Sequence, residues 1–455
     1  MTLIQSGKFT NTKFFIHLDN RDNQDNMSSK IISIKGTRDY YPEEMAVRSY
    51  IYQKARLVSE SFGYQEIDGP FLESIDLYAA KSGEELVKEQ SFVFEDRGGD
   101  LIALRPELTP SIARMVSQRQ NQLVYPLRWW SWGPFWRYER PQKGRTREFF
   151  QWNIDLIGVD SPEADAEMVA IAANFLIELG LSSGQVKVLV NNRQLMDSEM
   201  QDLDIPGDLR LNVFRLIDRR DKLSPDGWVS YGKDMGLTSQ QISGLEILLG
   251  DFELWRKSND LIRFFQVIES LGVSEYVQFA PHIIRGLDYY TGTVFEVWDE
   301  DGEFRAILGG GRYDSLVEAV GGKPLPAVGF AMGDLIISLV LKKFNRFPKS
   351  ISQPAAQILV TVFDHTTMTN SYKMASSLRR AGFNVVSYPI HDKLSKQFRF
   401  GDRMGIELAL ILGPDEIENK QISIKDLRTG EQTTILEMDV IKFISERIGE
   451  KNKIS

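Results

Sequence analysis

A concentration of positive charge stands between two aromatic segments of this chain. Arg137, Arg140, Lys143, Arg145 and Arg147 place five cations within eleven residues. Side chains of like charge repel one another, and an arginine can hold a phosphate through two parallel hydrogen bonds, so an anion is the natural stabilising partner. A solvated hairpin tip over an aromatic core is the alternative interpretation. The pattern therefore indicates either a phosphate-binding segment or a polar turn.

Three other segments have an unusual mixture of residue types. In residues 104–110, the acid Glu107 and the hydroxyl of Thr109 stand at the start of an expected helix, where they either cap that helix or bind a ligand. In residues 284–296, an Arg, an Asp and two adjacent Tyr lie between glycines, which allow a backbone or a ligand to approach closely. Residues 309–311 are three glycines, and for these we expect a tight turn.

Length and composition exclude several classes of site. The 455 residues predict about three domains, and the net charge of −9 argues against indiscriminate coating of nucleic acid. Cys is absent and the four His are scattered, so no metal site built from Cys or His is expected and a metal would need oxygen ligands, which favours Mg²⁺. No phosphate-cradling G-x-x-x-x-G-K-[ST] motif and no G-x-S-x-G motif occurs. A bound nucleotide would therefore be held by side chains.

No apolar run approaches the roughly 18 residues that a membrane helix needs. We therefore expect no membrane partner. The absence of Cys suits a reducing compartment, and we expect a cytoplasmic protein.

The elements that must position these groups can be read from the periodicity of apolar residues. Residues 1–30 are polar without sustained periodicity and predict a disordered tail. Apolar spacings of three and four over residues 47–62 predict a helix, and Ser161 is the candidate N-cap of a second helix over residues 163–179. Residues 127–136 and 149–157 predict strands on either side of the cationic segment.

The second half of the chain changes character twice. Helical periods replace strand signals over residues 193–279 and predict an inserted helical module, after which strand signals return at residues 294–297 and 306–308. Residues 346–354 predict a linker. A small α/β domain is expected over residues 355–455, with four strands at residues 357–363, 383–388, 407–412 and 421–427.

Several segments together resemble one known family. They are residues 35–42 (KGTRDYYP), 135–145 (FWRYERPQKGR), 285–290 (RGLDYY), 327–333 (AVGFAMG), 402–405 (DRMG) and 424–430 (IKDLRTG). These segments resemble the opening motif, the second motif and its loop, the histidine-specific signature, the approach to the third motif and the C-terminal domain of histidyl-tRNA synthetase, a class II aminoacyl-tRNA synthetase. The resemblance runs from about residue 31 to residue 448.

The resemblance implies an α/β protein. It implies an α+β catalytic core with an antiparallel sheet over residues 31–345, interrupted by the helical insertion, and a C-terminal anticodon-binding domain of the α/β class. The implied activity is that of a histidine–tRNA ligase, which activates histidine with ATP to histidyl-adenylate and transfers it to the 3′ end of tRNA(His). ATP, Mg²⁺ bound with the ATP phosphates, histidine, tRNA(His) and a second copy of the chain are the implied cofactors and partners. The helix over residues 47–62 is compatible with a homodimer but could equally face the core.

The resemblance also implies roles for individual residues. Arg137 and Arg285 would be the catalytic pair that grips the α-phosphate of ATP, where negative charge grows during the reaction, and Arg145 would also contact ATP. Arg140 and Gln142 would meet the acceptor end of the tRNA. The implied histidine-binding residues are Glu107, Thr109, Gln151, Asp155, Tyr289, Tyr290 and Tyr313. A carboxylate with phenolic hydroxyls suits an imidazole, which donates or accepts at both nitrogens.

The C-terminal domain has its own concentration of positive charge. Between Lys373 and Arg403, seven cations face two acids, a net charge of +5 in an acidic protein. This charge suits contact with tRNA phosphates, with an affinity that falls as salt rises, although a solvated face is the alternative for some of the lysines.

Two positions depart from the pattern of the family. Asp155 stands where Glu is frequent. Residues 333–336 contain no cation, although the third motif usually closes with an arginine that contacts ATP. Our hypothesis is that Arg145 or Arg147 covers the outer phosphates instead.

Two other functions are compatible with such a fold, because a fold alone does not decide function. One is the synthetase-like regulatory subunit of ATP phosphoribosyltransferase, which typically lacks the anticodon domain and has degraded second-motif and histidine-signature residues. The other is a tRNA-sensing module of the kind attached to a kinase, but this sequence has no kinase signature. Histidine-dependent exchange of pyrophosphate into ATP separates an enzyme from both.

Overall fold

The computed structural model describes residues 32–79, 90–142, 144–284, 289–348, 351 and 354–452. The tail expected over residues 1–30 and the expected site residue Arg285 lie outside this part of the chain. Among the helices that are described, none combines the length and the apolar character required to cross a membrane.

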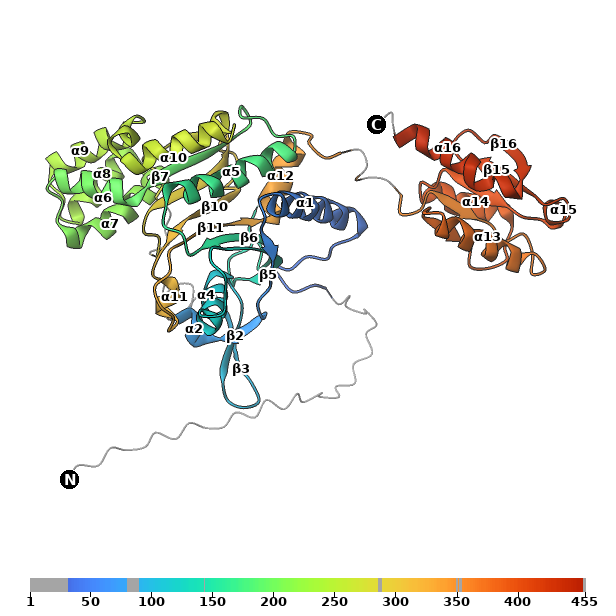
Figure 1. The fold of residues 1–455 in the computed structure, drawn as a ribbon, viewed down its shortest axis with the longest axis horizontal. Coiled ribbons are helices and arrows are strands. Elements are labelled where there is room, and N and C mark those ends of the chain that lie inside the picture. Colours follow the sequence, from blue (N-terminus) through green and yellow to red (C-terminus); the bar gives the residue numbers. More distant parts are fainter. Residues whose placement is uncertain are drawn as a thin grey trace, which may run out of the picture.

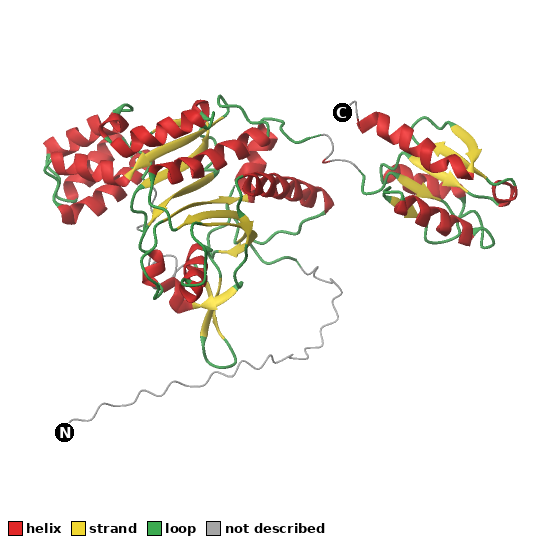
Figure 2. Ribbon diagram, in the orientation of Figure 1, coloured by secondary structure: helices red, strands yellow, loops and turns green. Residues whose placement is uncertain are grey.

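An eight-stranded sheet forms the centre of the N-terminal part (Figure 1, Figure 2). The strands lie in the order β1-β5-β6-β11-β10-β9-β7-β8. In sequence order they are β1 (Gln65–Glu66), β5 (Leu127–Trp136), β6 (Glu148–Ile157), β7 (Val186–Asn192), β8 (Val277–Phe279), β9 (Thr293–Asp299), β10 (Leu308–Tyr313) and β11 (Ala327–Gly333). The outermost pairs, β1 with β5 and β7 with β8, run parallel, and the inner pairs run antiparallel. The expected α/β class with an antiparallel core is therefore confirmed.

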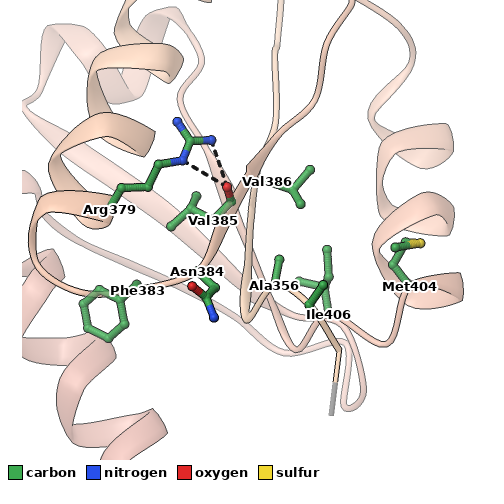
Figure 3. A pocket seen from close by; sticks show the side chains of 9 residues that line it. Ala356, Arg379, Phe383, Asn384, Val385, Val386, Met404 and Ile406 are labelled. Atoms are coloured by element: carbon green, nitrogen blue, oxygen red, sulfur yellow. Dashed lines mark hydrogen bonds between the residues drawn. The ribbon is translucent and has the colours of Figure 1, made fainter. Parts of the chain in front are cut away.

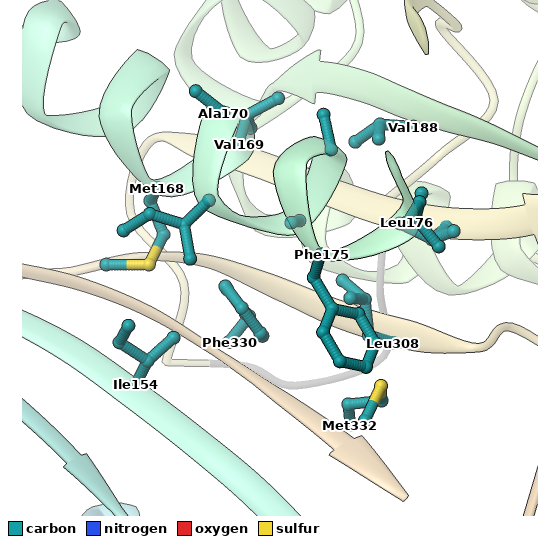
Figure 4. Close-up of a cluster of buried hydrophobic side chains, with 14 of the residues drawn as sticks. Ile154, Met168, Val169, Ala170, Phe175, Leu176, Val188, Leu308, Phe330 and Met332 are labelled. Atoms are coloured by element: carbon teal, nitrogen blue, oxygen red, sulfur yellow. The ribbon is translucent and has the colours of Figure 1, made fainter. Parts of the chain in front are cut away.

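Three helices cover one face of this sheet: α1 (Pro42–Ser61), α5 (Pro162–Glu178) and α12 (Asp334–Lys343). Figure 4 shows the core between them, where Ile154, Leu308 and Phe330 of the sheet meet Met168 and Phe175 of α5. Each such side chain contributes roughly 1.5–3 kcal/mol when fully buried. These helices stabilise the sheet from one side, and the functional site lies on its opposite face.

The helix expected over residues 47–62 faces the core. Ile51, Ala55 and Val58 of α1 are buried against the sheet. The apolar stripe of this helix is thus buried against the sheet of the same chain. Helix α5 begins as expected, because the Ser161 side chain accepts a hydrogen bond from the Ala164 amide at 3.2 Å.

The opposite face of the sheet carries a second apolar cluster. Helix α4 (Thr109–Arg119) and the short α11 (Leu316–Ala319) pack there against Tyr290, Val294 and Tyr313. Beside them lies a three-stranded sheet made of β2 (Leu72–Ser74), β4 (Leu101–Leu104) and β3 (Phe92–Glu95), with the short α2 (Ile75–Ala79).

A helical module follows β7, as the periodicity predicts. Its helices are α6 (Arg193–Asp202), α7 (Gly207–Asp218), α8 (Pro225–Asp234), α9 (Ser239–Leu249) and α10 (Asn259–Ser270). Most of their buried side chains form a core of their own, including Met196, Leu216 and Leu245, while α10 also buries Phe264 and Ile268 against the main sheet. The strand β8 returns to the main sheet within the range expected to be helical, because a three-residue strand paired with distant β7 gives no periodic signal.

The expectation of a tight turn at residues 309–311 is wrong. All three glycines lie within strand β10 and are buried. A Cβ on Gly310 would overlap the Gly329 carbonyl of the next strand, and a Cβ on Gly311 would lie 2.7 Å from the Thr293 carbonyl and 2.8 Å from the Tyr290 ring. Gly310 and Gly311 are therefore required by close neighbours in the folded chain, which the local sequence does not reveal.

The C-terminal part forms a five-stranded sheet in the order β13-β12-β14-β15-β16. The strands are β12 (Ile358–Val360), β13 (Val385–Ser387), β14 (Leu408–Ile411), β15 (Gln421–Asp426) and β16 (Gln432–Leu436). The helices are α13 (Met368–Arg380), α14 (Leu394–Arg403), α15 (Pro414–Glu418) and α16 (Val440–Asn452). The four expected strands are confirmed. The fifth, β16, was not expected because its residues are mostly exposed and polar.

A buried ion pair fixes the end of β10 to the start of α5. Arg312, 4% exposed, donates to the Asp165 carboxylate at 2.6 and 3.0 Å and to the carbonyls of Val159 and Ser161. We expect Arg312→Met to lower the free energy of unfolding by about 3–5 kcal/mol, because it leaves Asp165 buried without its cation. Urea unfolding at pH 8 measures this. In the control, Arg312→Met combined with Asp165→Leu should recover most of the loss, and a single-variant loss below about 1 kcal/mol would contradict the assignment.

Candidate functional site

Strand β6 presents a row of polar side chains to the face of the sheet opposite α1 and α5. Successive side chains of a strand alternate between faces, so Gln151, Asn153 and Asp155 share one face, whereas Trp152 and Ile154 enter the core of the other. Buried polar groups in such a row cost free energy unless they are satisfied. This face is therefore where a ligand is expected, and we call it the site face.

Asp155 and Tyr313 form a buried pair on the site face. Each is 4% exposed, and the Tyr313 hydroxyl donates to Asp155 Oδ1 at 2.5 Å. Burial raises the pKa of the Asp155 carboxyl to about 7, and the hydrogen bond from Tyr313 opposes that rise. Among the described residues, no cation contributes to this pKa shift. The second carboxylate oxygen can therefore accept a hydrogen bond from a ligand that brings an N–H group.

Two adjacent tyrosines complete an aromatic wall beside this pair. The Tyr289 and Tyr290 ring centroids lie 4.9 Å apart, and the Tyr289 ring lies 6.1 Å from that of Tyr313. All three pack in the cluster that contains the start of α4. The structure thus brings Asp155 together with Tyr289, Tyr290 and Tyr313, although Asp155 lies far from the three tyrosines in sequence.

Gly329 leaves the space that the Asp155 carboxylate occupies. A Cβ at this position would overlap Asp155 Oδ1 and lie 2.6 Å from the Ile154 carbonyl. We expect Gly329→Ala to lower the free energy of unfolding by about 1–3 kcal/mol, because the backbone carbonyl cannot move aside freely. Urea unfolding measures the loss. The matched control is Gly333→Ala at the end of the same strand, where a Cβ meets nothing within 4 Å, and equal losses in both variants would refute this account.

Glu107 and Thr109 lie where the chain enters α4. Glu107 is 7% exposed, and Thr109 is the first residue of the helix. The residue before the helix, Leu108, makes no side-chain cap hydrogen bond. The segment is held beside strand β5, since the Trp136 amide donates to the Arg105 carbonyl at 3.1 Å. This hydrogen bond joins the backbone two residues before the buried Glu107 to the end of β5.

Arg137 follows β5 directly and is oriented by that same segment. Its Nε donates to the Pro106 carbonyl at 2.9 Å, and its guanidinium lies 5.4 Å from the centre of the Phe149 ring. Its amide donates to the Arg147 carbonyl at 2.9 Å, which extends the hairpin beyond the two strands. The guanidinium is therefore fixed at its Nε side.

Arg137 lines a cavity of about 160 Å³ at the end of the site face. Its other lining residues come from the hairpin tip, from the loop before β10 and from the start of α12: Glu139, Gly144, Arg145, Thr146, Phe149, Arg305, Gly333, Asp334, Leu335 and Ile336. Three guanidiniums thus line a small space together with the Glu139 carboxylate, whereas the Asp334 carboxylate accepts from the Phe150 amide at 3.1 Å. Such a cavity is suited to a polyanion.

The remaining cations of the hairpin have different surroundings. Arg145 forms an ion pair with Glu139 inside the cavity. Arg147 does not line the cavity: it lies over the Tyr138 ring at 4.0 Å and donates to the Lys35 carbonyl at 3.3 Å. Arg140 and Gln142 are exposed near the tip.

Three polar residues of this region were not expected from the sequence. Asn153 and Ser131 are cross-strand partners on the site face, 4% and 1% exposed, and within the described chain neither Asn153 Nδ2 nor Ser131 Oγ has a hydrogen-bond partner. Period-two alternation from Asp155 could have identified Asn153. Arg305 is the single cation of the loop between β9 and β10, and no local pattern distinguishes it from a solvated charge.

A larger cavity, of about 290 Å³, lies in the C-terminal part (Figure 3). Its charged side chain, Arg379, is engaged within the domain, because its guanidinium donates to the Val385 carbonyl and to Ser387 Oγ. The rest of the lining is mainly apolar, with Val386, Met404 and Ile406. It contains no arrangement of groups comparable to the site face.

The site face can bind a ligand that is polar at both ends. Near one end, Asp155 and three tyrosines suit a flat ring with N–H groups, and at the other end Arg137 and its neighbours suit phosphate. Residues 149 and 155 of β6 span about 20 Å at the usual rise of a strand. Preorganised cations in such a place stabilise charge that develops on a phosphorus centre.

Comparisons with known proteins agree on one family. Residues 36–334 match the family model described as histidyl-tRNA synthetase, and residues 357–447 match the model described as anticodon binding domain. The chain is 39% identical over 434 residues to the histidine–tRNA ligase of Thermoplasma volcanium, covering 92% of this chain and 99% of that protein. It is 36% identical to the histidine–tRNA ligase of Haloarcula marismortui, covering 89% and 95%. A crystal structure of histidyl-tRNA synthetase from Nostoc sp. PCC 7120 aligns with a TM-score of 0.78 at 25% identity, covering 92% of this chain and 99% of that one.

Proposed function

The chain belongs to the histidyl-tRNA synthetase family, and on this premise we propose how it acts as an ATP-dependent histidine–tRNA ligase. Histidine and ATP bind along the site face and form histidyl-adenylate, and the histidyl group is then transferred to the 3′ end of tRNA(His). The observation that carries the proposal is the buried Asp155–Tyr313 pair on the same sheet as a cavity lined by arginines.

Asp155 recognises the imidazole of histidine. Its carboxylate accepts a hydrogen bond from one ring N–H while it holds the Tyr313 hydroxyl, and Tyr289 and Tyr290 enclose the ring. An amino acid without a ring N–H would leave the buried carboxylate unpaired, which costs more than the loss of a contact alone. This explains selection of histidine by the pocket.

Glu107, Thr109 and Gln151 hold the α-amino group and its surroundings. Glu107 and Gln151 are 7% and 9% exposed, and the Glu107 carboxylate and the Gln151 amide oxygen can accept from an ammonium group. Because Arg137 is hydrogen-bonded to the neighbouring Pro106 carbonyl, the amino group and the phosphate would be positioned by one short segment.

Arg137 stabilises the reacting phosphate. The histidine carboxylate oxygen forms a bond to the α-phosphorus of ATP, the bond from that phosphorus to the bridging oxygen breaks, and its electron pair leaves with pyrophosphate. A fixed guanidinium is most effective where this negative charge grows. Arg285, which lies outside the described residues, is proposed to act from the other side, on the basis of the sequence resemblance. Alignment of the two substrates supplies much of the remaining acceleration.

The outer part of ATP occupies the cavity beside Arg137. Arg145 contacts ATP there, and Glu139 offers carboxylate oxygens of the kind that Mg²⁺ accepts beside phosphate ligands. Bound Mg²⁺ would supply neutralisation of phosphate charge. Arg147 is a weaker candidate than Arg145, since it contacts Tyr138 and the Lys35 carbonyl instead.

The tRNA contacts follow the same proposal. Arg140 and Gln142 are exposed at the hairpin tip and would meet the acceptor end, with the helical module along the acceptor stem. The C-terminal part, residues 355–455, would bind the anticodon and use the cations between Lys373 and Arg403. A homodimer in the cytoplasm completes the proposal.

Exchange of labelled pyrophosphate into ATP tests the function. We expect exchange that depends on histidine and is absent with the other amino acids, followed by transfer of labelled histidine to tRNA(His). A folded protein without histidine-dependent exchange would overturn the proposal and favour the regulatory subunit of ATP phosphoribosyltransferase. A protein that performs exchange but not transfer would contradict the proposed tRNA contacts.

A further inference from the structure

Arg305 is the cavity-lining cation that sequence reasoning did not identify. It lies in the loop between β9 and β10, and its exposed side chain reaches the edge of the cavity that Arg137 and Arg145 also line. The start of α12 lines the same cavity. The hairpin between β5 and β6 and the loop between β9 and β10, which are distant in sequence, therefore bring three guanidiniums to one small space.

The three guanidiniums differ in how they are held. Arg137 Nε donates to the Pro106 carbonyl, and Arg145 is paired with Glu139. Within the part of the chain that the structure describes, no hydrogen bond or ion pair engages the Arg305 guanidinium. Desolvation lowers the pKa of Arg305, and the charges of Arg145 and Arg137 lower it further, while Glu139 opposes them. An anion in the cavity would relieve this repulsion.

The start of α12 provides no positive charge to this cavity. Leu335 and Ile336 are apolar, and Asp334 is directed elsewhere, because its carboxylate accepts from the Phe150 amide at 3.1 Å and lies 3.9 Å from Arg38. The sequence likewise has no arginine in residues 333–336. A polyphosphate in the cavity would thus have a cation on the β10 side and none on the α12 side.

We propose that Arg305 binds the β- and γ-phosphates of ATP and the departing pyrophosphate, and so supplies the cation that the start of α12 lacks. This inference rests on the proposed histidine–tRNA ligase function. When the bond between the α-phosphorus and the bridging oxygen breaks, the electron pair passes to pyrophosphate, whose negative charge increases. Arg305 stabilises that leaving group, whereas Arg137 stabilises the phosphorus centre under attack.

The test compares Arg305→Ala and Arg305→Lys with the parent protein in histidine-dependent pyrophosphate exchange. Arg305→Ala should raise the KM for ATP and for pyrophosphate by about 10- to 100-fold, as expected for loss of a charge-assisted contact, with the KM for histidine unchanged. Arg305→Lys retains the charge and should lose less. The matched control is Arg119→Ala, an exposed arginine at the far end of α4 outside the cavity, which should match the parent.

A second measurement separates a phosphate contact from a disturbed pocket. A non-hydrolysable histidyl-adenylate analogue has no β- or γ-phosphate, so its Kd should be the same for Arg305→Ala and the parent. Unchanged KM values for ATP and pyrophosphate in Arg305→Ala would overturn the inference, as would an equal loss of affinity for ATP and the analogue. Absence of exchange in the parent protein would instead contradict the proposed function itself.

Discussion

Replacing Asp155 with Asn should lower kcat/KM for histidine by about 100-fold or more without destabilising the free protein. Asn cannot provide the ionised acceptor for the imidazole N–H, and it presents an amide donor that the ring cannot always satisfy. The substitution is nearly isosteric, and its carbonyl oxygen can still accept from the Tyr313 hydroxyl. Histidine-dependent pyrophosphate exchange measures the loss, and urea unfolding measures stability.

The raised pKa of the Asp155 carboxyl predicts how the stability of the protein changes with pH. The folded pKa of about 7 is raised above the usual value of 3.8, so the buried carboxyl favours the protonated state, and the ionised form costs stability as the pH rises through that range. The cost is about 4 kcal/mol at most above pH 7. Asp155→Asn should therefore gain stability relative to the parent as the pH rises from 4 to 8. In the parent, the KM for histidine should rise as the pH falls below 7.

Asp165→Asn is the matched control for stability. Asp165 is equally buried, but its carboxylate pairs with Arg312 at 2.6 Å, so its neutralisation should destabilise the protein at pH 8. If Asp155→Asn were as destabilising as Asp165→Asn, or if it kept the affinity for histidine, the assignment of Asp155 as a ligand-binding group would be wrong.

Arg137→Ala should lower the rate of histidyl-adenylate formation by about 10²- to 10³-fold, the usual loss when one preorganised donor is removed from a developing charge. The KM for histidine should change little, because Arg137 lies at the phosphate end of the site face. Arg137→Lys should also be impaired, since a lysine cannot both donate to the Pro106 carbonyl as Nε does and bind phosphate through a planar fork. Single-turnover measurement of adenylate formation provides the rate.

Arg119→Ala serves as the control for this prediction, because it removes an arginine outside the cavity. A parent-like rate in Arg137→Ala, with folding intact by circular dichroism, would exclude Arg137 from the reaction. A rise in the KM for histidine that accounts for the whole loss would place Arg137 in substrate binding and not at the phosphorus centre.

Much of the fold could be predicted because its signals are local. The apolar residues of α1 recur at spacings of three and four, and the Ser161 cap of α5 is formed by the residues beside it. The glycines of β10 could not be placed in the same way. Their role depends on Gly329, Thr293 and Tyr290, which approach them only in the folded chain.

Site residues could be predicted where the sequence resembles the motifs of the family. Asp155, Tyr289, Tyr290 and Tyr313 lie together, although their roles remain predictions. Arg305 could not be predicted, because an isolated arginine in a loop gives no indication of which cavity it reaches. Only the juxtaposition of that loop with the hairpin and with α12 distinguishes it from a solvated charge.

A crystal structure with a non-hydrolysable histidyl-adenylate analogue tests the central claim most directly. We expect the imidazole N–H within hydrogen-bond distance of the Asp155 carboxylate and the phosphate-mimicking group against the Arg137 guanidinium. An analogue bound in the reverse orientation, or bound away from the site face while Asp155 and Tyr313 stay enclosed, would contradict the account.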